Sequence, residues 1–505
     1  MQNAPLPLSV AATQERAATG IAGLDNVLGG GLPTHHVYLV EGTPGAGKTT
    51  LGLQFLQAGR AEGESGLYIT LSETKHELTI VAESHGWTLD GIEIFELVSQ
   101  EGLSPDAQQS ILYTSEVELG ETTRAVMAAV ERLRPTRLVF DSLSEMRMLA
   151  QDPLRYRRQI LALKHFFASH NCTVLLLDDM TSEGGDLQLH SIAHGVLALE
   201  QSTGDYGPVR RHVRVVKMRG VRYRGGEHDL TLDTGGIRVY PRLIAAEYRA
   251  DVVAQTVGTG TPALDRILGG GLSRGSNTLL IGPSGVGKTT TALSAVLAAL
   301  QRGERAQYYL FDEGVGTLLH RCEALGIAVK PHIDSGQLRL MPLDPAEVSP
   351  GQFSNMVRDA VETDGASVVV IDSLNAYMQS MPGAKFLLLQ MHELLSYLNQ
   401  QGVVTLLVMG QHGLVGEGRS DVDLSYLSDA IVLFRFFEAR GALRKAVSVV
   451  KSRTSDHELS IREFRLGTGG IEVGPPLNDF EGVLTGVPSY RGIVPLLGAA
   501  APEAR

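Results

Sequence analysis

Two copies of one glycine-rich stretch constrain the fold of this 505-residue chain more than any other feature. The first reads GTPGAGKTT from Gly42 to Thr50, and the second reads GPSGVGKTT from Gly282 to Thr290. Both match G-x-x-x-x-G-K-[ST], a loop whose backbone N–H groups turn inward around anionic oxygens. The helix that follows such a loop adds its positive N-terminal end. Each copy therefore predicts a phosphate-binding loop between a strand and a helix.

The residues of both loops are candidates for contact with ATP. We expect Lys48 and Lys288 to reach the β- and γ-phosphates and to be catalytic. Thr49 and Thr289 are expected to hold Mg²⁺ through their hydroxyls. A glycine turn with a stray lysine is the alternative, which two copies in matching contexts disfavour. The expected ATP-binding loop residues are Gly42, Thr43, Pro44, Gly45, Ala46, Gly47, Lys48, Thr49 and Thr50, and Gly282, Pro283, Ser284, Gly285, Val286, Gly287, Lys288, Thr289 and Thr290.

The repeat is larger than the loop. The segment TGIAGLDNVLGGGL from Thr19 recurs as TGTPALDRILGGGL from Thr259, with the same offset of 240 residues as the loops. Apolar strands then alternate with helices in both halves, which predicts an α/β fold with mainly parallel sheets covered on both faces. Ligands of such sheets bind at the carboxyl ends of the strands. We expect a flexible leader at residues 1–17, ATPase lobes at residues 18–245 and 246–478, and a tail at residues 479–505.

Composition narrows the classes of function. The net charge of −12 at pH 7 disfavours a general nucleic-acid binder, which usually presents a basic face. Cys172 and Cys322 are the two cysteines, and their distance in sequence shows neither a zinc motif nor a disulfide framework. The N-terminus lacks the pattern of a secretory signal, and no run of about 18 apolar residues predicts a membrane span. We therefore expect a cytoplasmic protein without a membrane partner.

Acidic residues follow two strands in each half. Asp141 ends the apolar run RLVF and Asp372 ends SVVVI, where a carboxylate can hold Mg²⁺ beside the loop threonine. Glu73 follows the second strand of the first half, and Asp312 and Glu313 stand at the matching place, where a carboxylate can polarise an attacking water or hydroxyl. The alternatives are a capped turn and solvated acids. The candidate metal ligands are Thr49, Asp141, Thr289, Asp312 and Asp372.

A pair of basic residues occupies the same place in each half. Lys217 and Arg219 lie two apart in VVKMRG, and Lys451 and Arg453 lie two apart in VVKSRT. Within a strand, this spacing sends both side chains of a pair to one face. Two cations at an edge can reach a neighbouring subunit's γ-phosphate, as arginine fingers do. Solubilising charges on an edge strand are the alternative interpretation.

Together these motifs resemble the KaiC family over nearly the whole chain, including ITLSET and SHGW, SDAIVLF and the tail segment FEGVLTGVP. The resemblance implies two tandem RecA-like P-loop NTPase domains, with ATP and Mg²⁺ as cofactors. It also implies a double-ring homohexamer with ATP bound between subunits. Slow ATP hydrolysis in the first ring and autophosphorylation in the second are implied as well. The further ATP-binding residues that it implies are Ser84, Lys217, Met218 and Arg219 in the first lobe and Lys445, Lys451 and Arg453 in the second.

The sequence departs from the family pattern at the functional positions. Clock-type members carry paired glutamates after the second strand, where this chain has Ser72-Glu73 and Asp312-Glu313. At the family's adjacent Ser-Thr phosphosites this chain has Ser425-Tyr426, with Ser428 close by. Ordinary loop hydroxyls are the alternative for these serines. We expect hydrolysis mainly in the first lobe, a serine/threonine autokinase activity on Ser425 or Ser428, and signalling outside a full circadian clock.

A RecA-like DNA recombination or repair ATPase is the alternative function. Such proteins bind strands through loops that line the hole of the ring. The corresponding segments here, DDMTSEGGDLQLHS and GQHGLVGEGRSDVDLS, carry more acids than bases, which opposes binding to a phosphate backbone. A nucleotide-locked scaffold without turnover is a third hypothesis. The expected partners are the chain itself as a homohexamer and a regulatory protein, either a KaiB-like protein or a histidine kinase.

Overall fold

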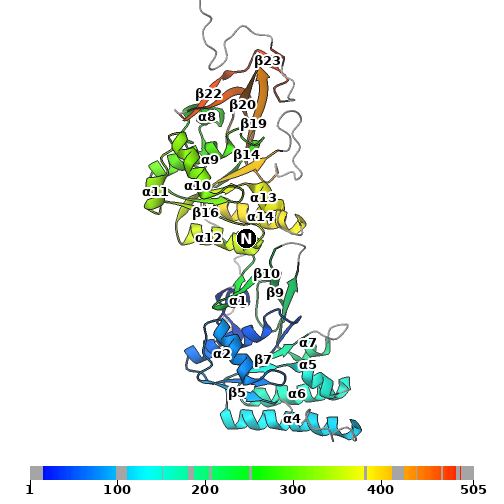
Figure 1. Cartoon of the computed structure of the whole chain (residues 1–505). Coiled ribbons are helices and arrows are strands. Elements are labelled where there is room, and N and C mark those ends of the chain that lie inside the picture. The colour runs from blue at the N-terminus through cyan, green and yellow to red at the C-terminus, as the bar shows by residue number, and fades with distance from the viewer. Residues whose placement is uncertain are drawn as a thin grey trace, which may run out of the picture. The chain divides into compact units, whose positions relative to one another are not determined.

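The chain divides into two compact units, Met1–Arg242 and Leu243–Arg505, here called the first and second lobes. A computed structural model describes the chain in the following ranges: 15–97, 111–150, 152–179, 187–203, 207–248, 253–379, 384–411, 426–439, 441–467, 470–484 and 489–490. Each lobe contains a nine-stranded, mainly parallel sheet within these ranges, which confirms the predicted α/β fold (Figure 1). Among these residues, no helix has the length and apolar character needed to cross a bilayer.

In the first lobe, the strand that leads into the phosphate loop lies inside the sheet. This strand, β3 (Val37–Gly42), pairs in parallel with β7 (Thr173–Asp178) and β8 (Gly195–Ser202). Beyond β7 the parallel strands are β6 (Arg137–Asp141), β4 (Gly66–Thr70) and β5 (Ile92–Glu96). Beyond β8 the antiparallel strands are β9 (Arg210–Met218), β10 (Glu227–Asp233) and β11 (Gly236–Tyr240).

Helices cover both faces of this sheet because β3 and its neighbours are apolar on both sides. Tyr38 and Val40 point into one core, and Val37 and Leu39 point into the other, as the two-residue period of a strand requires. The first core is closed by α1 (Ala22–Leu28), α2 (Lys48–Ala61) and α3 (Lys75–Ser84). The second is closed by α4 (Ile111–Leu133), α5 (Leu143–Ala150), α6 (Pro153–Ser169) and α7 (Leu187–Ile192).

The second lobe repeats this plan. Its loop strand β14 (Ser276–Gly282) pairs in parallel with β18 (Val404–Gly410) and β19 (Ala430–Ala439). The other strands are β15 (Arg305–Leu310), β16 (Leu338–Pro342), β17 (Ala366–Asp372), β20 (Ala442–Ser452), β21 (Arg462–Gly467) and β22 (Gly470–Pro476). The helices are α8 (Pro262–Ile267), α9 (Lys288–Gln301), α10 (Val315–Ala324), α11 (Lys330–Asp334), α12 (Pro350–Glu362), α13 (Leu374–Gln379) and α14 (Ala384–Gln400).

Short strands stand at the outer ends of the described parts of both lobes. Arg16 and Ala17, expected in the leader, form β1 and pair with β2 (Leu32–Pro33), while residues 1–14 lie outside the described ranges. The second lobe has the same pair, β12 (Thr256–Val257) with β13 (Leu272–Ser273). Phe480, expected in the tail, packs against Phe437 with ring centroids 5.3 Å apart. It begins β23 (Phe480–Glu481), which pairs with β24 (Ser489–Tyr490). Strand pairing and aromatic packing extend both lobes into these segments.

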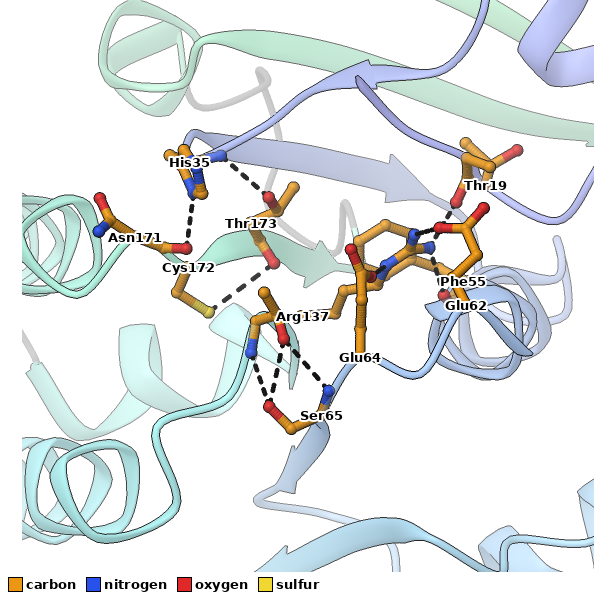
Figure 2. Close-up of polar contacts among 12 residues, drawn as sticks. Thr19, His35, Phe55, Glu62, Glu64, Ser65, Arg137, Asn171, Cys172 and Thr173 are labelled. Carbon is orange, nitrogen blue, oxygen red and sulfur yellow. Dashed lines mark hydrogen bonds and ion pairs between the residues drawn. The ribbon is translucent and has the colours of Figure 1, made fainter. Parts of the chain in front are cut away.

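A buried arginine of the first lobe bonds to several acceptors on and around α2 (Figure 2). Arg137 opens β6, is 1% exposed, and lies 4.8 Å from the ring centroid of Phe55. Its guanidinium pairs with Glu62 at 2.9 Å and with Glu64. It also donates to the carbonyls of Ala18 at 2.5 Å and Phe55 at 3.0 Å. A buried guanidinium needs this many acceptors, so Arg137 fastens the end of α2 and the chain before α1 to the sheet.

We predict that Arg137→Met lowers the free energy of unfolding of the first lobe by about 2–3 kcal/mol. The loss falls at the low end for a broken buried pair, because Glu62 and Glu64 are 54% and 30% exposed and can be hydrated. The matching strand position holds Val368, so an apolar side chain suits the strand itself. Urea unfolding measures the effect, with the exposed Arg132→Met as control. An unchanged midpoint would contradict the structural role of Arg137.

Candidate functional site

Each phosphate loop begins where its strand ends and closes where its helix starts. The loop glycines adopt left-handed backbone angles, with φ of 82° at Gly45 and 107° at Gly47 in the first lobe, and 75° at Gly285 and 123° at Gly287 in the second. Side-chain-bearing residues resist these angles. A Cβ at Gly287 would also lie 2.8 Å from Leu466. The local backbone therefore requires glycine at these positions.

Both loop lysines fold back over their own loops. The Nζ of Lys48 donates to the carbonyls of Gly42 at 2.9 Å and Thr43 at 3.1 Å. The Nζ of Lys288 makes the matching contacts with Gly282 at 2.9 Å and Pro283 at 2.8 Å. Both lysines are buried, at 7% and 8% exposure. Their ammonium groups thus lie at the loops, where the β- and γ-phosphates are expected.

The strand-end aspartates lie beside the loop threonines, as their spacing predicted. Thr49 Oγ1 donates to Asp141 Oδ2 at 3.3 Å, and the Thr289 hydroxyl bonds Asp372 in the same way. Tyr68 and Tyr308 donate their hydroxyls to these aspartates at 2.5 Å and 2.7 Å. Sequence patterns did not single out the two tyrosines, although each stands in the neighbouring strand at its equivalent position.

This hydroxyl–carboxylate pair fits Mg²⁺, which takes oxygen ligands and is usually completed by substrate phosphates and water. Burial raises the pKa of Asp141 and of Asp372, so a cation there would offset the cost of their charge. No group of three or more His, Cys, Asp and Glu side chains converges to hold a metal in the described ranges. A metal at either site would therefore depend on the nucleotide for its remaining ligands.

The acids after the second strand differ between the lobes. Glu73 has a buried Oε2 without a hydrogen-bond partner in the described part of the chain. Burial raises the pKa of Glu73, and the nearby carboxylates of Asp141, Glu77 and Asp179 raise it further. In the second lobe, Glu313 instead forms an ion pair with Arg321, and Asp312 accepts a hydrogen bond from the hydroxyl of Ser373. Only the acid of the first lobe is therefore left with a spare buried acceptor among these three.

Asp179 is a candidate site residue that the sequence analysis did not identify. Its Oδ1 pairs with Lys48 Nζ at 2.7 Å. In the second lobe Gly410 pairs with Gly282 in the sheet, so no acid stands at the end of β18. An incoming phosphate must compete with Asp179 for Lys48, whereas no acid pairs with Lys288 Nζ within the described ranges. The sequence does show two consecutive aspartates, Asp178 and Asp179, at the end of an apolar strand. Only the parallel register of β3 and β7, however, shows that this strand end lies beside the phosphate loop.

The basic pairs lie at the opposite end of the sheet from the phosphate loop of their own lobe. Met218 pairs with Gly195 at the start of β8, whereas Gly42 pairs with Leu199 near its end. Lys217 donates to the carbonyls of His190 and Ala193, and Arg219 donates to Ser191 O at 2.7 Å. In the second lobe, Lys451 donates to Ser428 O at 2.6 Å and Arg453 to Tyr426 O at 3.4 Å. Neither pair faces its own loop.

Lys445, which the resemblance grouped with Lys451 and Arg453, lies at the other end of the sheet from that pair. Its Nζ donates to Gly285 O at 3.0 Å, so it touches the phosphate loop of its own lobe. Arg211 makes the equivalent contact in the first lobe, from Nε to Gly45 O at 3.2 Å. The sequence analysis did not single out Arg211, because nothing in one strand's pattern shows which end of it meets the loop. Arg211 on β9 and Lys445 on β20 therefore contact matching positions of the two phosphate loops.

A family model for the KaiC ATPase matches residues 17–244 and 257–478. The chain belongs to the KaiC family. It is similar to the circadian clock protein KaiC3 of Synechocystis sp., with 27% identity over 482 residues, covering 94% of this chain and 95% of that protein. It is also similar to the circadian clock oscillator protein KaiC of Parasynechococcus marenigrum, with 26% identity over 503 residues and coverage of 97% and 96%. Membership in this ATPase family implies nucleotide binding.

The remaining positions expected from the KaiC resemblance are either engaged or buried in the structure, or lie outside the described residues. Ser84 ends α3 with its hydroxyl bonded to Val81 O at 2.7 Å, and Met218 is buried with 8% exposure. Ser428 is fully buried, whereas Ser425 lies outside the described residues. The segments 180–186 and 412–425, which include most of the two loops weighed for DNA binding, also lie outside them. For these KaiC positions, the contact with nucleotide stays a prediction.

We predict that nucleotide affinity of the second lobe falls as pH rises through about 8. Burial lowers the pKa of Lys288 to about 8, and the Asp372 carboxylate offsets part of this. Phosphate binds the ammonium form, which predominates below that pKa and is lost above it. The limiting loss is about tenfold per pH unit. Titration of a fluorescent ATP analogue into Lys48→Ala protein from pH 7 to 9.5 measures it.

Lys288→Arg is the matched control, because its guanidinium stays charged over this range. Its affinity is expected to stay level where that of the native lysine declines. A flat profile for the native lysine would contradict the assignment.

Proposed function

We propose that this KaiC-family chain is an ATP-driven hexameric switch that hydrolyses ATP slowly in its first lobe and phosphorylates its own serines through its second. The observation that carries the proposal is the buried Oε2 of Glu73, which has no hydrogen-bond partner among the described residues, in the lobe that holds Lys48, Thr49 and Asp141. Glu313, at the matching place, is engaged by Arg321. This difference favours hydrolysis in the first lobe.

In the proposed reaction, Glu73 acts as the general base. A water oxygen bonds to the γ-phosphorus while the bond from that phosphorus to the bridging oxygen breaks, and its electron pair leaves with ADP. Glu73 takes the proton of the water. Lys48 offsets the charge on the phosphate oxygens. Mg²⁺, held by Thr49 and Asp141, would supply further neutralisation of the phosphates. The raised pKa of Glu73 brings it nearer to neutrality, which suits proton transfer at physiological pH.

The placement of the basic pairs supports assembly through unlike surfaces. Phosphate loop and basic pair occupy opposite ends of each sheet, so a basic pair does not reach the loop of its own lobe. Such head-to-tail contacts generate a ring when the rotation closes. We therefore propose a double-ring homohexamer in which Lys217 and Arg219 meet the ATP of a neighbouring first lobe. Lys451 and Arg453 would do the same between second lobes, while Lys445 acts on the loop of its own lobe.

For the autokinase half, we propose Ser425 as the first acceptor. The fully buried Ser428 would have to leave its site before it could accept a phosphoryl group. A cytoplasmic location and regulation by a KaiB-like protein or a histidine kinase complete the proposal. A DNA recombination or repair ATPase remains the second candidate, which the net charge of −12 disfavours. Salt-dependent binding to single-stranded DNA would revive it.

Glu73→Gln is predicted to lower ATP hydrolysis by the first lobe about a hundredfold, because glutamine keeps the shape but cannot take a proton. The measurement is release of labelled phosphate by protein that also carries Lys288→Ala, so that the second lobe is silent. Glu83→Gln, at an exposed position on helix α3, which follows Glu73, is the matched control. Unchanged hydrolysis by Glu73→Gln would rule out Glu73 as the base.

The same labelled ATP tests the autokinase half in the unmodified protein. We expect label on Ser425 by peptide mapping, and its loss in Lys288→Ala protein but not in Lys48→Ala protein. Absence of label from both Ser425 and Ser428 would remove this half of the proposal and leave hydrolysis untouched.

Shared sites between subunits predict complementation. Arg219→Ala and Lys48→Ala proteins, each also carrying Lys288→Ala, are expected to hydrolyse little ATP alone. After mixing in equal amounts, about a quarter of the interfaces join an intact loop to an intact arginine, so activity is expected to return to about a quarter. Native mass measurement with and without ATP reports the ring. No recovery between variants that still assemble would contradict a site shared between subunits.

A further inference from the structure

The first turns after the second strand carry different side chains in the two lobes. α3 starts two residues after Glu73, and α10 starts two residues after Glu313. The two helices also have the same length of ten residues. At the seventh position of each helix the first lobe has Val81 and the second has Arg321. This position is therefore one difference between the surroundings of the two glutamates.

Arg321 is built into the second site rather than free in solvent. Its NH2 group pairs with the carboxylate of Glu313, and the two side chains are 35% and 24% exposed. The Nε of Arg321 is buried without a hydrogen-bond partner in the described ranges. Its charge also reaches Asp372, where it offsets part of the burial that raises the pKa of that carboxyl. The guanidinium therefore pairs with one acid expected to serve the nucleotide and acts electrostatically on another.

Val81, at the matching position of the first lobe, has no charged group and cannot form an ion pair with Glu73. It is partly buried and packs against the apolar core formed by α1, α2 and α3. Within the described part of the first lobe, Glu73 keeps one buried oxygen without a hydrogen-bond partner. A carboxylate with a spare lone pair can accept a proton from water, whereas one held in an ion pair with a guanidinium has its charge stabilised and its acceptor occupied.

We propose that Arg321 is a positioning residue that suppresses ATP hydrolysis in the second lobe by holding Glu313 in an ion pair. The inference rests on the proposed function, because it takes the glutamate after the second strand as the base. In the suppressed step, the proton of the water would pass to Glu313 while the water oxygen bonds to the γ-phosphorus and ADP leaves. With Glu313 held, ATP in the second lobe persists for transfer to a hydroxyl.

The test removes the guanidinium and reads hydrolysis by the second lobe alone. In Lys48→Ala protein, Arg321→Val is expected to raise phosphate release about tenfold or more. Arg321→Lys keeps the charge and is expected to stay near the starting rate. Addition of Glu313→Gln to Arg321→Val is expected to abolish the gain. A gain of activity that depends on Glu313 is not what a structural lesion produces.

A second readout needs neither nucleotide nor turnover. In the nucleotide-free protein, Arg321→Val is expected to lower the melting temperature of the second lobe, and to lower it less when Glu313 is already glutamine. Equal shifts in both backgrounds would show that the ion pair does not exist in solution and would overturn the inference. Arg321→Gln serves as the variant if Arg321→Val does not fold.

Two other outcomes overturn it as well. A fall in hydrolysis by Arg321→Val, with nucleotide affinity retained, would mean that Arg321 acts on the phosphates. A rise that persists with Glu313→Gln would mean that Glu313 is not the base it restrains. Failure of the proposed function itself shows separately, as unchanged hydrolysis by Glu73→Gln in the first lobe.

Discussion

The parallel pairing of each loop strand with both of its neighbours is the constraint on which the rest of the molecule depends. β3 lies between β7 and β8, and β14 lies between β18 and β19, so carboxyl ends gather at one edge of each sheet. This edge receives the phosphate loop, its lysine and the strand-end aspartate. The antiparallel return of β9 and β20 carries the basic pairs to the other edge. One hydrogen-bonding pattern thus places the phosphate loop and the basic pair of each lobe at opposite ends of its sheet.

On this common scaffold the two sites carry different charges. In the first lobe, Asp179 competes for Lys48 and Glu73 keeps an unpartnered oxygen. In the second lobe, Gly410 leaves Lys288 without an acidic competitor at that position, and Arg321 engages Glu313. The first arrangement suits turnover, since phosphate is held against a competing carboxylate and a base is available. The second suits retention of ATP until an acceptor hydroxyl arrives. A few side chains on one backbone therefore account for the proposed division of labour.

The lobes also reach similar packing by different routes. In the first, Arg137 comes from the sheet to bind Glu64 and the carbonyl of Ala18. In the second, where the strand holds Val368, Arg302 comes from the end of α9 to bind Glu304 at 2.7 Å and the carbonyl of Gly258 at 3.0 Å. The matching acceptors of the two lobes are thus bound by arginines that stand at different positions of the repeat.

 Arg302 occupies the position that corresponds to Glu62 in the first lobe. The arginine therefore lies at the end of a helix in the second lobe and on a strand in the first, while the acceptors occupy matching positions.

The sequence by itself determined the tandem α/β fold, the two phosphate loops and the acids at the strand ends, because short patterns encode them: glycine spacing, apolar alternation and a carboxylate after a buried run. It could not place Asp179 against Lys48, Arg211 against Gly45, or Arg321 against Glu313. The first two contacts join residues more than a hundred positions apart, and all three depend on strand register or helix phase. Only the tertiary structure decided them, since a pairing energy acts between side chains that folding has already brought within a few ångströms of each other.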